Sequence, residues 1–359
     1  MTVILFIVGL VILIGGAELF LRSVDKFGAA WSVSPVVMGL TVVAFATGAP
    51  ELAISLQAAV EGKPDLVLGN ILGSNVANIL LILGIAGLVS PLKITNRIIK
   101  IDIPAVIGAS TLLFVLAVDG VLSPLDGGII LGALVLYSVF MYTQIRKDRA
   151  LNRLQQQAKI DVGEPVTSLF YGKYIFFLLA GLVLIVLGSR WMVEAAVEIA
   201  GILGISELII GLTIVSIGTS LPEVATSLAA VRKGDSDTAV ANVMGSNLYN
   251  ILLTLGLTII IAPGVIDVSA SAIKLDLPIM LIVAIACLPL FWPGKLLGRM
   301  EAAGFLFYYS VYMAYLVLIA INHPFKEQLE WGMIWIVIPI TIVLIVVKFV
   351  TDFRKEKLT

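Results

Sequence analysis

Apolar stretches long enough to cross a hydrocarbon core of about 30 Å as helices recur along the whole chain. They predict eleven membrane-spanning helices, at residues 2–20, 34–60, 66–90, 103–119, 124–144, 173–190, 203–231, 238–262, 274–292, 302–321 and 332–350. The predicted fold class is therefore an all-α integral membrane protein.

The composition excludes a water-soluble globule. Of the 359 residues, 60% are hydrophobic and only 13% are charged, whereas soluble domains carry about 25% charged residues. The first apolar stretch has no basic segment before it and no small-residue cleavage site after Phe20. We therefore expect it to be retained as a membrane span and not removed as a signal peptide.

Basic residues gather on one side of the predicted membrane. If the N-terminus lies outside, 19 of the 23 lysines and arginines fall in inside segments. Cytoplasmic loops of membrane proteins carry such an excess. We expect a multi-pass protein of the cell (plasma) membrane, with the N-terminus outside and the C-terminus in the cytoplasm. An even number of spans would remove this separation of charge.

The two halves of the chain repeat each other. The segment GLTVVAFATGAPELAISL at 39–56 matches GLTIVSIGTSLPEVATSL at 211–228, and GNILGSNVANILLILG at 69–84 matches ANVMGSNLYNILLTLG at 241–256. With a constant offset of 172 residues, 23 of 46 aligned positions are identical. Chance in apolar sequence does not produce such agreement, so the halves are internal repeats.

This repeat predicts the domain organisation. Residues 1–144 form a first five-helix repeat, 145–172 a charged cytoplasmic linker, and 173–321 a second five-helix repeat. Because five is odd, the second repeat must enter the membrane upside down. Residues 322–359 add an accessory eleventh helix and a cytoplasmic tail. The expected core is thus a ten-helix (5+5) inverted repeat, as in many secondary transporters, whose ion sites lie near the midplane where the repeats meet.

Two glutamates lie in the interior of apolar spans. Glu51 and Glu223 occupy equivalent repeat positions, where each acid costs about 2.5–3.5 kcal/mol on insertion scales. A cost present twice at matched positions indicates a use. Pro50 and Pro222 precede them and should break each helix, which frees backbone carbonyls for other partners.

Polar residues accompany both glutamates at four-residue spacing, which places side chains on one face of a helix. The four stripes comprise Thr47, Glu51 and Ser55; Thr219, Glu223 and Ser227; Asn70, Ser74 and Asn78; and Asn242, Ser246 and Asn250. All of them can present oxygen, the ligand that Ca²⁺ and Na⁺ prefer. The single cysteine, Cys287, is expected to be a buried small residue. The single histidine, His323, lies in a predicted loop, so thiolate or imidazole metal sites are not expected.

These residues carry a resemblance to a known family. TGAPE at 47–51 with GSNVAN at 73–78, and GTSLPE at 218–223 with GSNLYN at 245–250, resemble the paired motifs of sodium/calcium exchangers of prokaryotic type in the cation/calcium antiporter superfamily. The resemblance extends more loosely over residues 1–321. It implies a secondary antiporter, not an enzyme, that exchanges several Na⁺ for one Ca²⁺ by alternating access.

The resemblance also implies roles for individual residues. Glu51 and Glu223 would be the central carboxylates shared by Ca²⁺ and Na⁺, and Asn78 and Asn250 would lie near the middle. The remaining oxygens, for flanking Na⁺ sites, would come from Thr47, Thr219, Ser220, Ser74 and Ser246. Ca²⁺ and Na⁺ are the expected substrates and the lipid bilayer is the expected surrounding; no cofactor and no nucleic acid is expected.

Two positions depart from the family pattern. Gly48 stands where the family often has a hydroxyl residue, while its repeat mate Ser220 keeps the hydroxyl. One Na⁺ site is then weaker, or a carbonyl completes it. Asn250 stands where K⁺-dependent members and some prokaryotic ones have aspartate, which argues against K⁺ co-transport.

Three alternatives remain open at this point. A Ca²⁺/H⁺ antiporter would use the same two glutamates to bind protons, although hydroxyl-rich stripes favour Na⁺. An intramembrane enzyme would need further acids, bases or metal ligands, and the sequence contains no HExxH motif and no histidine in a predicted span. A channel is the third, but an inverted repeat with broken helices favours alternating access.

Overall fold

The computed structural model describes residues 2–31, 33–60, 62, 64–155, 166–202, 216–292 and 294–356, and these are almost wholly helical. The helices of the first half are α1 (Thr2–Trp31), α2 (Pro35–Met38), η1 (Gly39–Val43), α3 (Ala44–Thr47), α4 (Ala49–Val60), α5 (Pro64–Ala77), η2 (Asn78–Ile82), α6 (Leu83–Val89), η3 (Ile98–Asp102), α7 (Ile103–Ala117) and α8 (Pro124–Gln155), where η marks a π-helical turn.

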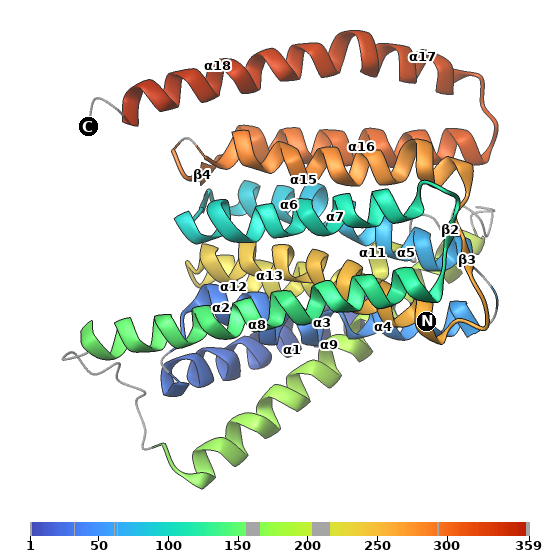
Figure 1. Cartoon of the computed structure of the whole chain (residues 1–359). Coiled ribbons are helices and arrows are strands. Elements are labelled where there is room, and N and C mark those ends of the chain that lie inside the picture. Colours follow the sequence, from blue (N-terminus) through green and yellow to red (C-terminus); the bar gives the residue numbers. More distant parts are fainter. Residues whose placement is uncertain are drawn as a thin grey trace.

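The second half and the C-terminal segment follow the same plan. Their helices are α9 (Ser168–Ile202), α11 (Ser216–Thr219), α12 (Leu221–Arg232), α13 (Ser236–Tyr249), η5 (Asn250–Leu255), α14 (Gly256–Ile261), η6 (Ala272–Asp276), α15 (Leu277–Phe291), α16 (Arg299–Ala320), α17 (Phe325–Gly332), η7 (Met333–Val337) and α18 (Ile338–Glu356). The short strands are β1 (Leu92–Lys93), β2 (Val121–Leu122), β3 (Ile266–Asp267) and β4 (Leu296–Leu297). Most helices run side by side along one direction (Figure 1).

Within the described ranges, ten helical segments are long and apolar enough to cross a membrane. They are Ile7–Trp31, Val36–Val60, Pro64–Val89, Ile98–Ala117, Pro124–Gln144, Ser168–Gly188, Ser236–Ile261, Ala272–Phe291, Arg299–Ile319 and Phe325–Thr351. They correspond to ten of the eleven predicted spans. The other, predicted at 203–231, falls partly on residues 203–215, which lie outside the described residues; its remainder forms α11 and α12.

Several predicted boundaries are wrong because a helix continues beyond its apolar run. The first predicted span ends at residue 20, but α1 continues to Trp31 through charged residues. The fourth begins at Ile98 instead of residue 103. Helical structure from α8 and α9 also enters both ends of the predicted linker at 145–172. Backbone hydrogen bonds sustain these extensions without any need for apolar side chains.

Helices α1 and α9 cross in opposite directions at matched glycines. Gly9 and Gly16 precede Gly181 and Gly188 by 172 residues. A Cβ atom at Gly181 would lie 2.9 Å from the Gly16 carbonyl oxygen, and one at Gly188 would lie 2.7 Å from the Gly9 carbonyl oxygen. The absence of side chains permits this close packing, which small residues also permit between other membrane helices. The equivalent helices of the two repeats are thus antiparallel, as an inverted repeat requires.

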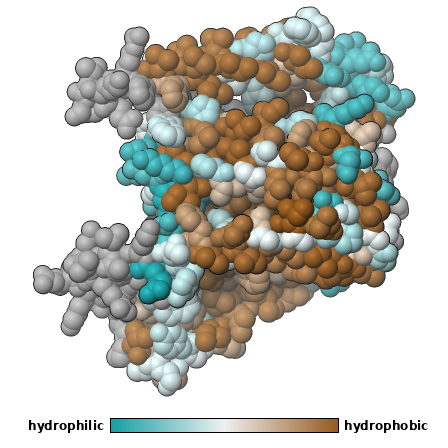
Figure 2. Space-filling model, viewed as in Figure 1, coloured by the Kyte–Doolittle hydropathy of each residue, from teal (hydrophilic) through white to brown (hydrophobic). Residues whose placement is uncertain are grey.

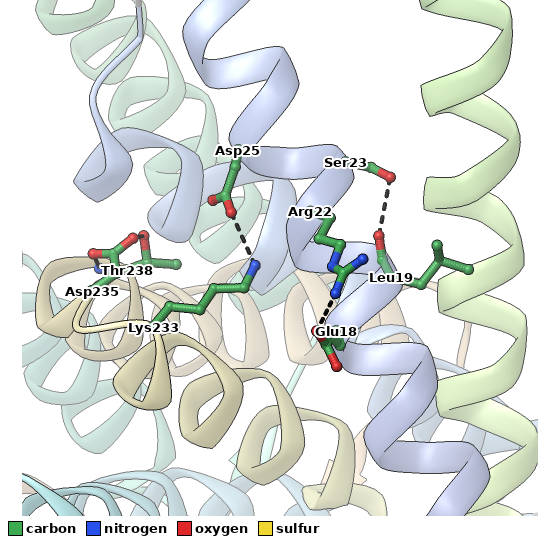
Figure 3. A network of polar contacts seen from close by, with 8 residues as sticks. All are labelled: Glu18, Leu19, Arg22, Ser23, Asp25, Lys233, Asp235 and Thr238. Atoms are coloured by element: carbon green, nitrogen blue, oxygen red, sulfur yellow. Dashed lines mark hydrogen bonds and ion pairs between the residues drawn. The ribbon is translucent and has the colours of Figure 1, made fainter. Parts of the chain in front are cut away.

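Contacts at the helix ends join segments that the predicted topology places on one side. Strand β1 pairs with β4, and β2 pairs with β3, each pair drawing one strand from each repeat. In Figure 3, Lys233 at the end of α12 reaches Asp25 on α1, with Nζ 3.0 Å from Oδ2. Figure 2 shows hydrophobic residues over the middle of the bundle and hydrophilic residues towards its two ends.

The C-terminal segment α17–η7–α18 lies along the outer edge of the bundle in Figure 1. Two polar contacts attach it to α16: the Tyr308 hydroxyl donates to Thr341 Oγ1 at 2.6 Å, and Lys348 Nζ lies 2.6 Å from Glu301 Oε1. Most of its large apolar side chains are exposed, as expected of a lipid-facing helix. Its peripheral place fits the predicted accessory helix.

The two residue types that occur once take the places expected of them. Cys287 is fully buried on α15, and its Sγ donates to the Val283 carbonyl at 3.5 Å. His323 lies between α16 and α17, where its Nδ1 accepts a hydrogen bond from the Phe325 backbone N–H at 3.1 Å. Neither residue approaches the glutamates through a described contact.

Candidate cation-binding site

Both helices that carry the glutamates are broken at equivalent residues. Helix α3 ends at Thr47 and α4 begins at Ala49; α11 ends at Thr219 and α12 begins at Leu221. The residues at the breaks, Gly48 and Ser220, have nearly the same backbone angles, φ −75° and ψ 2° against φ −86° and ψ 4°. The breaks predicted from Pro50 and Pro222 are therefore confirmed, since proline cannot donate to the turn before it.

Each glutamate is buried and has one free carboxylate oxygen. Glu51 and Glu223 are each 1% exposed. Glu51 Oε1 accepts from the Ser220 hydroxyl at 3.4 Å, and Glu223 Oε1 accepts from the Ser246 hydroxyl at 3.4 Å. Oε2 of each glutamate is buried without a hydrogen-bond partner. The two carboxylates also lie within electrostatic range of each other, so two negative charges share one buried region.

Threonines of one repeat lie beside the glutamate of the other. The Thr219 hydroxyl is a hydrogen-bonding neighbour of the Glu51 carboxylate, and the Thr47 hydroxyl is a neighbour of the Glu223 carboxylate. The sequence pattern had placed each threonine on one face with its own glutamate. The helix break interrupts that face, and each threonine meets the other repeat instead.

The second polar helix of each repeat changes to a π-helical turn at its last asparagine, since η2 begins at Asn78 and η5 at Asn250. Such turns are frequent at functional sites. Asn78 Nδ2 donates to Asn247 Oδ1 at 2.9 Å, and Asn247 Nδ2 donates to the Asn75 carbonyl at 3.2 Å. Asn250 makes no side-chain hydrogen bond. It borders the other break, because a Cβ at Gly48 would lie 3.9 Å from Asn250 Oδ1.

Buried oxygens without partners are concentrated in this region. All nine predicted site residues are buried. Five of them contribute an oxygen that no protein group satisfies: Glu51 Oε2, Glu223 Oε2, Asn78 Oδ1, Asn250 Oδ1 and Ser74 Oγ. Buried polar atoms are normally hydrogen-bonded. Two carboxylates with neutral oxygens form the donor set that hard cations prefer.

The described contacts connect most of the nine residues. Three of them, Glu51, Thr219 and Ser220, form one group, and Glu223, Thr47 and Ser246 form another. Asn78 and Asn250 lie at the two π-helical turns, while Ser74 is buried on α5 without a described side-chain contact. The groups draw on both repeats, so the site forms only where the halves meet.

Sequence reasoning missed two sets of residues. Asn70 and Asn242 belong to the predicted stripes but were not selected as site residues, although both bridge the repeats. Asp102 and Asp276 lie in IKIDIP at 99–104 and IKLDLP at 273–278. These segments are offset by 174 residues instead of 172, so they fall outside the constant alignment. They lie on other spans and make no described contact with the glutamates.

Comparison with known proteins decides the family. A family model described as sodium/calcium exchanger protein matches residues 1–145 and 173–318. The chain belongs to the sodium/calcium exchanger family. It is therefore a multi-pass membrane transporter, a cation/calcium antiporter and not an enzyme.

Members of the sodium/calcium exchanger family resemble this chain along most of its length. It is 35% identical to inner membrane protein YrbG of Escherichia coli, covering 84% of this chain and 94% of that protein. It is 30% identical to sodium/calcium exchanger MaX1 of Methanosarcina acetivorans, covering 88% and 98%. A solved structure of the sodium-calcium exchanger NCX_Mj matches with a TM-score of 0.73 and 27% identity, covering 88% of this chain and 98% of NCX_Mj. The predicted all-α fold with two exchanger repeats is confirmed.

Proposed function

We propose that the protein exchanges Na⁺ for Ca²⁺ across the membrane by alternating access. The observation that carries this proposal is the set of buried, unpartnered oxygens contributed by both repeats. Glu51 and Glu223 provide two negative charges, which one Ca²⁺ balances. Neutral oxygens from Asn78, Asn250 and Ser74 complete a shell for which no soft ligand is available.

Hydroxyl groups around the carboxylates favour Na⁺ as the coupling ion. Thr47, Thr219, Ser220 and Ser246 adjoin a glutamate carboxylate, and Ser74 has an unpartnered hydroxyl oxygen. A proton would occupy a carboxylate and need none of these groups, whereas Na⁺ requires several oxygens. The similarity to MaX1 and NCX_Mj, both named sodium/calcium exchangers, supports the same ion pair.

The repeats give the units that move against each other. Residues 1–144 and 173–321 form the inverted repeats, 145–172 link them in the cytoplasm, and 322–359 hold the accessory helix and tail. The N-terminus lies outside and the C-terminus lies in the cytoplasm of the cell membrane. Pairing of β1 with β4 and of β2 with β3 supports this order of sides, and the basic residues favour its orientation.

The exchange is electrogenic and independent of K⁺. Binding of more than two Na⁺ in place of one Ca²⁺ moves net charge, and one charge crossing 100 mV corresponds to about 2.3 kcal/mol. Asn250 supplies a dipole and no third negative charge, so no additional monovalent cation is needed to balance the site.

The test is ⁴⁵Ca²⁺ uptake into proteoliposomes of the purified protein. An imposed Na⁺ gradient should drive uptake, a pH gradient of equal free energy should not, and a potential clamped with K⁺ and valinomycin should change the Na⁺-driven rate. Uptake driven by the pH gradient alone would replace this proposal with Ca²⁺/H⁺ exchange by the same glutamates. A rate that ignores voltage would replace electrogenic with neutral exchange.

A further inference from the structure

Two buried asparagines connect the broken helices of opposite repeats. Asn70 on α5 is 5% exposed, and Asn242 on α13 is 1% exposed. Asn70 Nδ2 donates to the Glu51 backbone carbonyl at 3.2 Å and to Ser55 Oγ at 3.0 Å. Both acceptors lie on α4 of its own repeat, so the amide nitrogen is held from two directions.

The amide oxygen of Asn70 faces the other repeat. Asn70 Oδ1 accepts from the Thr219 hydroxyl at 3.3 Å, and Thr219 is the last residue of α11 before the break. Reversing the amide would set its oxygen against the Glu51 carbonyl oxygen, an arrangement of two acceptors without a hydrogen. The amide therefore has one favourable orientation, which offers an acceptor to Thr219.

The second repeat contains the same connection in reverse. Asn242 Oδ1 lies 3.5 Å from the Thr47 hydroxyl, the last residue of α3, which also donates to the Val43 carbonyl at 3.1 Å. Asn242 Nδ2 donates to Ser227 Oγ at 3.1 Å and to Thr226 Oγ1 at 3.0 Å. Each asparagine thus joins the glutamate-bearing helix of its own repeat to the threonine of the other.

This arrangement determines where a threonine proton points. A hydroxyl has one hydrogen to donate and binds a cation through its lone pairs. Thr219 adjoins the Glu51 carboxylate, which is itself an acceptor. Asn70 Oδ1 gives the Thr219 proton an acceptor other than that carboxylate, so the hydroxyl oxygen can face a cation beside Glu51.

We propose that Asn70 and Asn242 are positioning residues, which act on bound cations through Thr219 and Thr47 without touching the ions. This role rests on the proposed function, in which the two threonines are Na⁺ ligands. It gives each half-site a residue from the opposite repeat as its ligand and a residue from its own repeat as that ligand's support.

The two connections differ in strength. Position 54 is Ile54 in the first repeat, so Asn70 reaches the Glu51 carbonyl directly. The equivalent Thr226 stands between Asn242 and the backbone, and its hydroxyl donates to the carbonyls of Pro222 at 2.8 Å and Glu223 at 3.2 Å. The Thr47–Asn242 contact is also longer than the Thr219–Asn70 contact. Substitution of Asn70 should therefore have the larger effect.

A double-mutant cycle tests the proposal on the purified full-length protein. Asn70→Ala, Thr219→Val and their combination are compared by the rise in unfolding temperature as NaCl replaces choline chloride, and separately as CaCl₂ is added. Each single substitution should raise the half-saturating Na⁺ concentration about three- to tenfold, as expected for one hydrogen bond to a binding group. The double variant should be no weaker than the weaker single variant, because the asparagine acts through the threonine.

The matched control pairs Asn70→Ala with Thr47→Val, the threonine that Asn242 supports. Those two effects should multiply, since the residues share no described contact. Multiplicative effects in the Asn70–Thr219 pair, or unfolding temperatures that fall without any change in half-saturating Na⁺, would overturn the positioning role. A wild type stabilised by neither ion would overturn both proposals. If the wild type binds both ions but does not couple them in vesicles, the proposed exchange alone fails, because the cycle measures binding.

Discussion

Ser220 stands at the helix break of the second repeat and donates its hydroxyl to Glu51, whereas the break of the first repeat is formed by Gly48, which can offer Glu223 no hydroxyl. The glutamates themselves are buried to the same extent. Glu223 receives its described serine bond from Ser246 of its own repeat. Nearly identical backbone at the two breaks thus presents different polar groups to the two carboxylates.

The central asparagines differ in the same manner. Asn78 is held by Asn247, whereas both amide atoms of Asn250 lack a partner. Duplication accounts for the shared backbone, and later substitution at single positions makes the two sides chemically distinct. We therefore expect cations bound on the two sides to be unequal in affinity, while both glutamates remain indispensable.

The largest effect should come from removing either central charge. Glu51→Gln and Glu223→Gln should each abolish ⁴⁵Ca²⁺ uptake into proteoliposomes, because loss of one member of a buried charge pair costs about 2–5 kcal/mol. Both variants should remain folded by size-exclusion chromatography, since burying a neutral amide costs no more than burying an acid. Full transport by either variant would contradict the assignment of that glutamate and the functional equivalence of the halves.

The sequence predicted the equivalence of residues but not their meeting. The alignment at offset 172 identified both glutamates, both breaks and the oxygen-rich stripes, because local patterns determine helices and proline breaks. It could not show that Thr47 lies by Glu223 and Thr219 by Glu51. Equivalence relates a residue to its copy, whereas contact in an inverted repeat joins a residue to a different residue of the other half.

Other features escaped because they depend on packing or on a changed offset. The π-helical turns at Asn78 and Asn250 have no composition signal, since apolar residues follow in either helix type. Asp102 and Asp276 lay beyond a two-residue change of offset. The end of α1 at Trp31 was missed because charged residues there resemble a loop, although the backbone remains helical.

The next effect concerns the two central asparagines. Wild-type exchange should not change when choline replaces K⁺ at fixed voltage, because Asn250 adds no charge. Asn250→Asp should alter cation selectivity, since it places a third carboxylate where no hydrogen bond is lost. Uptake of ⁴⁵Ca²⁺ is measured with Na⁺, K⁺ and choline varied independently.

Asn78→Asp is the matched variant for this experiment. It should lower the unfolding temperature more than Asn250→Asp, because it removes the donor to Asn247 and leaves two oxygens facing each other. Equal losses of stability would show that the difference between the two amides has no energetic weight. A wild type that requires K⁺ would show that some other group holds that ion.

A smaller effect should follow from making the breaks alike. Gly48→Ser should lower the half-saturating Na⁺ concentration about threefold, because a hydroxyl there would face the second site as Ser220 faces Glu51. The backbone angles already suit serine, and the added Cβ would lie 3.2 Å from the Ala44 carbonyl oxygen, which is tight. Na⁺-driven ⁴⁵Ca²⁺ uptake measures the change.

Gly48→Ala separates the steric cost from the hydroxyl effect, since it adds the Cβ alone. It should leave half-saturating Na⁺ unchanged or higher, and Ser220→Ala should raise it about threefold. If alanine and serine at position 48 behave alike, the hydroxyl is not a Na⁺ ligand on that side, and the difference between the breaks is only one of packing.

The smallest expected effect concerns stability at a second pair of matched residues, outside the site. The Tyr312 hydroxyl donates to Asp276 Oδ1 at 2.8 Å. In the first repeat Asp102 is fully buried near Arg97, with Nε 3.8 Å from Oδ2, and the buried Tyr137 hydroxyl has no hydrogen-bond partner. Tyr312→Phe should therefore destabilise the protein by about 1–3 kcal/mol, because it leaves a carboxylate oxygen unpaired. Tyr137→Phe, the matched variant, should change stability by less than about 0.5 kcal/mol, since no bond is lost. Unfolding temperatures of the two purified variants provide the comparison, and an equal fall in both would show that Tyr137 and Asp102 are hydrogen-bonded in solution as Tyr312 and Asp276 are.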